Sequence, residues 1–158
     1  MMLDYKKWLK VALIAIIALT VCFIFVQSML PPETSSEESD AVGEFVGEII
    51  PPETKPGEFI QINIRKIAHF SEFALLGLEI SLYALFFCRK KSFILMSYAF
   101  ALFIALVDET IQLFSGRGPS IFDVWLDFFG FATLAMIVYA VALAIRFFRG
   151  ERVERWLK

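Results

Sequence analysis

The sequence is short of histidine, cysteine and net charge. Its 158 residues include one histidine and two cysteines, and the formal net charge is −2. One histidine cannot make the HExxH pair of a zinc hydrolase, and the chain has no glycine-rich phosphate loop and no nucleophile elbow. So little net charge leaves no exposed basic face for nucleic acid. We therefore exclude a nucleic-acid partner and expect neither a cofactor nor a metal.

The two cysteines are poorly placed for a disulfide. Cys22 lies inside the first apolar run and Cys88 at the end of the second. The orientation derived below puts them in opposite halves of a membrane, whereas bonded cysteines need Cα atoms within about 7 Å. We expect two free thiols.

Apolar residues, by contrast, are abundant. They make up 58% of the chain and include 18 Phe, against about 45–50% in an average globular protein. A hydrocarbon core of about 30 Å takes about 20 helical residues to cross. Four runs are long enough: 8–30, 67–88, 92–114 and 121–148. The composition excludes a soluble enzyme of this length and predicts an all-α polytopic membrane protein, a bundle of four transmembrane helices.

These runs divide the chain into four regions. Residues 1–30 are an N-terminal tail and first anchor, 31–66 an acidic extracytoplasmic loop, 67–148 a three-helix core, and 149–158 a basic tail. The first run follows a positive stretch, as in a secretory signal. It is longer than the apolar run of a signal, however, and residues 26–29 offer no small-x-small cleavage site. An uncleaved anchor is therefore favoured.

The distribution of basic residues predicts the orientation. The two terminal tails and the loop before residue 92 hold 11 of the 15 Lys and Arg residues. The other loops hold only Lys55, Arg65, Lys66 and Arg117. Because basic segments stay on the inner side, we expect a multi-pass protein of the cell membrane with both termini in the cytoplasm.

The 31–66 loop has a pattern of its own. The sequence PPET occurs at 31–34 and again at 51–54. Two copies are too few for a repeat fold, and they indicate two stiff, extended segments. Between the copies, apolar residues from Val42 to Ile50 fall at helical spacing. This predicts a short amphipathic helix that lies on the outer leaflet or caps the bundle. A solvated acidic linker is the alternative.

Ionisable residues occur inside three of the predicted spans, where they are costly and usually mark a site. They are His69, Glu72, Glu79, Asp108, Glu109, Asp123 and Asp127. At about 1.5 Å of rise per residue, all but Glu79 fall within about 9 Å of the outer surface. The sequence thus predicts one continuous polar pocket there, closed by the 31–66 loop. The first span has no ionisable residue beyond Lys10 near its start, so we expect it only to anchor and pack.

Plainer interpretations exist for single residues. Ser120 and Asp123 match a capping box, Arg117 could be an interfacial anchor, and His69 could be a structural hydrogen-bonding group. Glu79, near the midplane, could be neutral and hydrogen-bonded or could extend a proton path. Because the remaining carboxylates cannot all stay ionised in low dielectric, they require protonation, a cation or basic residues over them. We expect Arg117 to pair with Asp123 or Glu109.

The polar residues also fall into a recognisable pattern. Residues 65–77 read RKIAHFSEFALLG, and the later block has DE at 108–109, Gln112, Gly116-Arg117 and S-x-x-D at 120–123. This resembles the VanZ-like membrane proteins. Phe73 departs from the Tyr often found there, and Asp127 stands where Asn is common. The resemblance implies an envelope protein, with a link to teicoplanin resistance in the family's namesake and no defined enzymatic activity.

The leading hypothesis is a protein that binds or processes a lipid-linked or amphipathic envelope molecule. For proton transfer or orientation we assign the candidate catalytic residues His69, Glu72, Glu109 and Asp123. The candidate ligand-binding residues are Arg65, Lys66, Asp108, Gln112, Arg117, Ser120 and Asp127. Membrane lipids or a lipid-linked precursor are the expected partners, and an oligomer is left open. The rivals are a non-catalytic module whose polar cluster only joins helices, and a small proton-coupled transporter.

Overall fold

The computed structural model describes residues 2–88, 90–118 and 120–149. Within these residues the chain forms five α-helices and no strand. They are α1 (Met2–Met29), α2 (Pro32–Ile49), α3 (Lys55–Phe87), α4 (Lys91–Phe114) and α5 (Ile121–Phe148). All but α2 are long and apolar enough to cross a membrane. The all-helical membrane fold is confirmed, while Arg89 and the basic residues after 149 lie outside the described residues.

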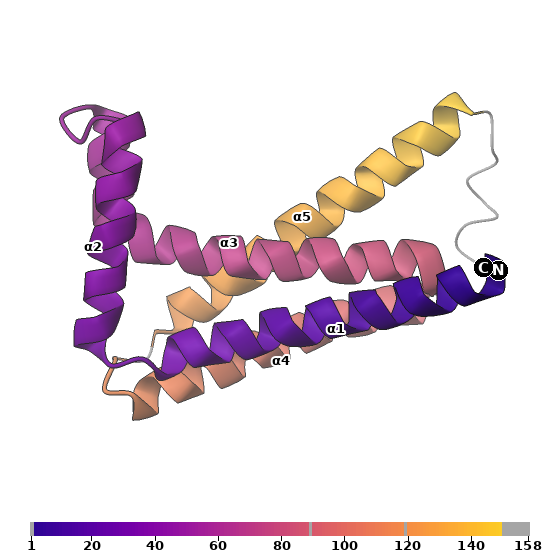
Figure 1. Cartoon of the computed structure of the whole chain (residues 1–158), viewed down its shortest axis with the longest axis horizontal. Helices are drawn as coiled ribbons and strands as arrows, with labels where there is room; N and C mark the ends of the chain where they lie inside the picture. The colour runs from indigo at the N-terminus through magenta and orange to yellow at the C-terminus, as the bar shows by residue number, and fades with distance from the viewer. Residues whose placement is uncertain (1, 89, 119, 150–158) are drawn as a thin grey trace.

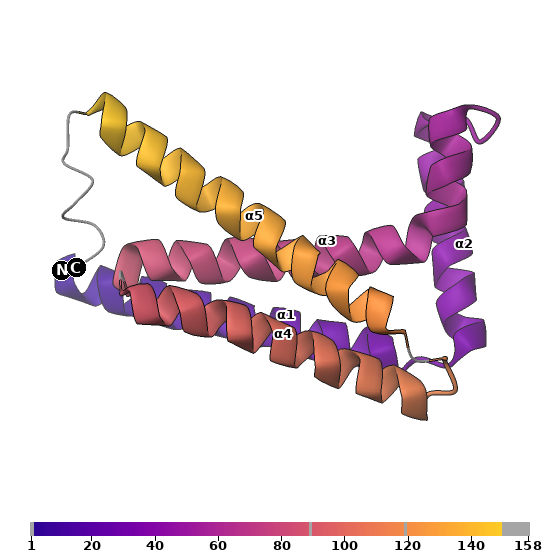
Figure 2. The same ribbon diagram turned by 180° about the vertical axis from the view of Figure 1, so that it is seen from behind.

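Four helices form the bundle, and α2 lies across one end of it. Figures 1 and 2 show α1, α3 and α4 running side by side, with α5 crossing α3 and diverging from it toward its C-terminal half. α1 and α4 finish at the end covered by α2, and α5 begins there. We call this the α2 end of the bundle. It collects the termini of three membrane helices and their connections in one place.

The segment between α1 and the membrane part of α3 is more helical than the sequence indicates. α2 begins at Pro32, whose missing N–H is no loss in a first turn. α3 begins at Lys55, behind an N-cap Thr54 whose hydroxyl accepts the Gly57 N–H at 3.2 Å. Figures 1 and 2 show the first turns of α3 beside α2 before the helix bends into the bundle. The predicted acidic loop is therefore a helical hairpin across the α2 end.

The pairing of α2 with α3 depends on a small residue and an amide. The Gln61 side chain donates from Nε2 to the carbonyl of Gly43 at 2.7 Å. A Cβ on Gly43 would lie 2.6 Å from the Gln61 Oε1. Apolar side chains of α2, including Phe45 and Ile49, stay exposed. This surface fits the predicted helix at a membrane interface, although the helix is longer than its apolar stretch suggested.

α3 and α5 cross at two glycines, each set against the backbone of the other helix. A Cβ on Gly77 would lie 2.2 Å from the Phe131 carbonyl oxygen, and a Cβ on Gly130 would lie 2.4 Å from that of Phe70. Small residues allow membrane helices to approach this closely. The crossing brings the first turns of α5, with Asp123 and Asp127, against the part of α3 that carries His69.

Aromatic and aliphatic side chains fill the interior below the crossing. Phe73, Leu76 and Phe131 are fully buried, and Tyr98 meets Phe131 edge to face with ring centroids 5.4 Å apart. Many large apolar side chains remain exposed on the outer faces of the bundle, as lipid contact requires: examples are Leu95, Phe103, Phe114, Phe129 and Met136.

Candidate functional site

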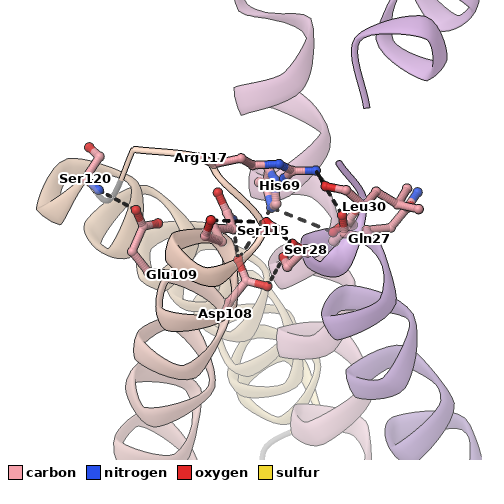
Figure 3. A network of polar contacts seen from close by, with 11 residues as sticks. Gln27, Ser28, Leu30, His69, Asp108, Glu109, Ser115, Arg117 and Ser120 are labelled. Atoms are coloured by element: carbon pink, nitrogen blue, oxygen red, sulfur yellow. Dashed lines mark hydrogen bonds and ion pairs between the residues drawn. The ribbon is translucent and has the colours of Figure 1, made fainter. Parts of the chain in front are cut away.

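Asp108 is the centre of the polar network at the α2 end, and its side chain is fully buried. Its Oδ1 accepts a hydrogen bond from the Ser28 hydroxyl of α1, and its Oδ2 accepts one from Gln112 Nε2 at 2.7 Å. The Nδ1 of His69, from α3, lies 3.9 Å from the same Oδ2. Figure 3 shows Ser28, His69 and Asp108 converging from three helices. Asp108 therefore joins α1, α3 and α4 at a single carboxylate.

Arg117 closes the network from above, in the turn between α4 and α5. Its Nη2 donates to the carbonyls of Gln27 and Leu30, at 3.1 and 3.0 Å, which belong to the last turn of α1 and the residue after it. The side chain is 7% exposed. Burial lowers the pKa of its guanidinium, and the nearby charge of Arg65 lowers it further. An arginine still stays charged in a protein, so a cation is fixed at this rim.

These contacts differ from the expected pairing of Arg117. Among the described residues it forms no ion pair with Asp123 or Glu109, and the ion pairs close to it are those of His69. The expectation was wrong because it took only the charges into account. The carbonyls at the end of α1 lack the N–H partners four residues on that a helix interior supplies, and they accept the guanidinium protons, although Gln27 also accepts the Leu30 N–H at 3.3 Å.

The α4–α5 connection is held by the backbone as well as by Arg117. Gly116 has a φ of +84°, a region that favours glycine. The Ser115 hydroxyl donates to the Ser28 carbonyl at 2.9 Å, and the Arg117 N–H donates to the Gln112 carbonyl at 3.0 Å. This turn is thereby fastened to the end of α1.

Glu109 has a role that the sequence assigned to another residue. Its Oε1 accepts the backbone N–H of Ser120, the N-cap of α5 (Figure 3). In a capping box that N–H would go to the residue three positions later, Asp123. The capping-box interpretation of Asp123 is therefore wrong in this structure, because a carboxylate from the preceding helix takes the place. Asp123 is left free to line a cavity.

Several buried polar atoms at the α2 end have no hydrogen-bond partner. These are His69 Nδ1, Glu72 Oε2, Glu109 Oε2, Arg117 Nε and Asp127 Oδ1. His69 Nδ1 lies 4.0 Å from Glu72 Oε2, one turn along α3. Asp127 is only 1% exposed. Buried polar atoms normally have hydrogen-bond partners. These five atoms lack one, whereas both carboxylate oxygens of Asp108 accept a hydrogen bond.

Two cavities adjoin these atoms. The larger, about 410 Å³, lies between α3, α4 and α5; six of its polar lining residues are Arg65, Lys66, His69, Arg117, Asp123 and Asp127. The smaller, about 100 Å³, lies under α2 and is lined by Ser35, Glu38 and Glu72 among others. Arg65, His69 and Arg117 line both.

The predicted single pocket is therefore divided. Asp123 lines the larger cavity and Glu72 the smaller, while neither Asp108 nor Glu109 lines either of them. Gln112 lines the larger cavity, and Ser120 contributes its backbone N–H to Glu109. The division arises because His69 and the two arginines stand between the two spaces. α2 covers the smaller one and reaches the larger one through its first residue, Pro32.

The first helix contributes more than anchoring and packing, contrary to the expectation. Ser28 bonds Asp108, and Thr20 donates its hydroxyl to Glu79 Oε1 at 2.8 Å. Glu79 is buried and lines neither polar cavity. A pattern of ionisable residues does not reveal these two hydroxyls, because Ser and Thr carry no charge. Their signal was a Ser and a Thr eight residues apart, close to one helix face.

Comparisons with known proteins agree with the pattern of polar residues. A family model described as VanZ/LLP1 matches residues 13–145, a range that begins within α1, ends within α5 and includes all of the candidate site residues. No curated protein and no solved structure matches the chain.

Proposed function

Because the chain belongs to the VanZ-like family, we propose that this membrane protein binds the anionic head group of a lipid or lipid-linked envelope molecule at the α2 end. The observation that carries the proposal is the larger cavity. Three basic side chains, Arg65, Lys66 and Arg117, meet there at the end of the membrane helices. A lipid lying alongside the bundle presents its head group at that level.

The cavity suits such a group in size, and its three basic side chains outnumber its two acidic ones, Asp123 and Asp127. Its volume of about 410 Å³ falls within the range of about 300–1,000 Å³ that small-molecule sites occupy. Arg117 is held by carbonyls through Nη2, so its position is fixed before any ligand arrives. Lys66 is exposed and free to adjust. A fixed cation and a mobile one together suit phosphate or carboxylate oxygens.

The rival interpretation, a non-catalytic module whose polar cluster only joins helices, explains only part of the network. Asp108 and Glu109 each accept a hydrogen bond that joins two segments, as the rival requires. Asp127, Glu72 and His69 instead leave polar atoms unpartnered beside cavities. A cluster that served only to join helices would gain nothing from unpaired polar groups, which cost about 1–3 kcal/mol each. We assign joining to the first group and ligand contact to the second.

The proposal places the α2 end outside the cytoplasm, in the cell membrane, in line with the positive-inside rule. Cysteine labelling in intact cells tests this after Cys22 and Cys88 are replaced by serine. A membrane-impermeant reagent should label a cysteine at Ser36 or at Gly118, where an added Cβ meets nothing within 4 Å. It should spare one at Lys91 until the cells are permeabilised. Labelling of Lys91→Cys in intact cells would refute this orientation.

The binding proposal is tested by lipid that copurifies with the protein. Mass spectrometry of wild type should show an anionic lipid or lipid-linked molecule enriched over the bulk membrane, and Arg117→Ala should lose that enrichment. Lys91→Ala, a basic residue at the opposite end, is the matched control and should keep it. Equal enrichment in wild type and Arg117→Ala would contradict the proposal. We further propose that this binding contributes to teicoplanin tolerance, so the same variant should lower the inhibitory concentration of the drug.

A further inference from the structure

We propose that His69, Asp108 and Asp127 bind a divalent transition-metal ion, with Zn²⁺ as the reference ion. The three residues come from α3, α4 and α5, and each offers one ligand atom within 4.8 Å of the others. The sequence alone indicated no metal because it holds a single histidine. The fold supplies the other ligands by bringing two aspartates from different helices to that histidine.

The spacing is close to that of a metal site. His69 Nδ1 and Asp108 Oδ2 are 3.9 Å apart. Two ligand atoms at about 2.0–2.1 Å from a tetrahedral ion would be roughly 3.4 Å apart. Contraction by about half an ångström at this pair lies within reach of small side-chain rotations. The other pairs of ligand atoms lie within 4.8 Å of each other and would contract by up to about 1.4 Å.

Unpartnered atoms point to a missing ligand independently of the spacing. Asp127 is 1% exposed, yet its Oδ1 has no hydrogen-bond partner, and the same is true of His69 Nδ1. Asp108, fully buried beside them, adds a second carboxylate. Within the described ranges neither aspartate has a Lys or Arg ion-pair partner. A divalent cation would satisfy both unpartnered atoms and compensate two buried negative charges at once.

Asp108 is already oriented as a ligand. Ser28 holds its Oδ1 and Gln112 holds its Oδ2. A carboxylate oxygen has two lone pairs, so Oδ2 can accept from Gln112 and still coordinate an ion. Hydrogen-bonded partners of this kind fix ligand orientation in metal sites. The hydrogen bond from Ser28 of α1 to Asp108 of α4 would thus orient a metal ligand as well as join the two helices.

One side of the proposed site is open. His69 and Asp127 line the larger cavity, whereas Asp108 lies behind them. Three protein ligands with an open position are typical of metal sites that bind an external group. One imidazole with two carboxylates suits Zn²⁺ or Mn²⁺ better than Mg²⁺ or Ca²⁺, which favour all-oxygen sites. The inference does not depend on the proposed head group, because the metal alone is the probe.

The test uses the full chain in detergent, purified without a polyhistidine tag and stripped with a chelator. Titration with Zn²⁺ should show one ion per chain, and Asp127→Asn should weaken the affinity at least about 10-fold. Asp123→Asn is the matched control. It removes the same charge one turn earlier on the same helix and from the same cavity, so it should change the affinity less than about threefold.

A second measurement needs no variant. His69 is the only histidine, so ¹⁵N-histidine labelling gives a single imidazole, and Zn²⁺ should shift its Nδ1 resonance. Failure of wild type to bind one equivalent, an unmoved Nδ1 resonance, or equal losses in the two Asp variants would each overturn the proposal. Arg117→Ala should keep Zn²⁺ binding. Loss of lipid in that variant with retained metal would show that the two proposals stand or fall separately.

Discussion

The two ends of the bundle differ in how their helices are held together. At the α2 end, buried polar side chains such as Asp108, Gln112 and Arg117 link segments through directional contacts. The opposite end has a cavity of about 300 Å³ lined by side chains of α1, α3 and α4. Apolar side chains such as Ile14, Ile80 and Phe93 make up most of its lining, with Tyr83 and Ser97 as its polar members.

The difference shows what determines helix position in this protein. Lipid tails are as apolar as leucine, so burial in a membrane bundle gives little preference for one helix arrangement. Hydrogen bonds do have direction, and here they gather where the site lies. The cavity at the apolar end is bounded by packed side chains, with aromatic contacts such as Tyr83 with Phe93. The following variants test whether stability follows this division.

The largest effect should come from the glycines between the two ends. Gly77→Ala or Gly130→Ala places a Cβ at 2.2 or 2.4 Å from a backbone carbonyl, and overpacking of this kind costs typically 1–3 kcal/mol or more. We expect a loss of about 3 kcal/mol in SDS-titration unfolding, the upper part of that range, because the clashing atom is backbone. Gly118→Ala is the control, since its Cβ would meet nothing within 4 Å. A loss below about 0.5 kcal/mol at Gly77, the size of an ordinary surface change, would show that the helices are not in contact there.

A smaller loss is expected at the polar end from Arg117→Ala. The change removes hydrogen bonds to two carbonyls at the end of α1, and bonds to charged groups contribute about 1.5–3 kcal/mol. We expect about 2 kcal/mol by the same unfolding assay, allowing for one of the two carbonyls finding water. Arg117→Lys should recover part of the stability, because a single ammonium replaces a planar fork incompletely. Equal stability of the two variants would mean that the guanidinium contacts do not hold the turn.

The smallest effects compare one hydroxyl from each region. Ser28→Ala and Thr20→Val each remove one bond from α1 to a buried carboxylate, and such contacts average about 0.6 kcal/mol in membrane proteins. We expect Ser28→Ala to cost more, because Asp108 is buried more completely than Glu79. Thermal melting in detergent would rank them. A larger loss of stability in Thr20→Val than in Ser28→Ala would contradict the expectation that the α2 end is held by the stronger polar contacts.

The sequence predicted the membrane helices well where hydropathy and helix limits coincide. The predicted spans at 92–114 and 121–148 agree with α4 and α5 to within one residue. The prediction for α3 began twelve residues late, because hydropathy marks lipid contact and falls at Arg65 and Lys66 while the helix continues. A hydropathy profile carries no information on where an amphipathic helix joins a membrane one.

The residues of the site could be predicted from the sequence, but the contacts between them could not. The depth estimate placed His69, Asp108 and Asp127 within about 9 Å of the outer surface, in one predicted pocket, and the structure gathers the three residues. The partners of Arg117 and Glu109 are backbone atoms, which no pattern of side chains reveals. Ser28 was missed because a hydroxyl in an apolar helix commonly bonds its own backbone. Long-range partners of that kind depend on helix packing.

The glycine crossing also makes α5 a lever. Asp127 lies three residues before Gly130, an arm of about 4.5 Å, whereas about eighteen residues beyond Gly130 give an arm of about 27 Å. Close backbone contact at the crossing resists sliding and leaves rotation as the easier motion. A rotation about the crossing that moved Asp127 by about half an ångström would swing the diverging end of α5 by about 3 Å, in proportion to the arms. A small displacement at the α2 end would thereby be magnified at the opposite end of the bundle.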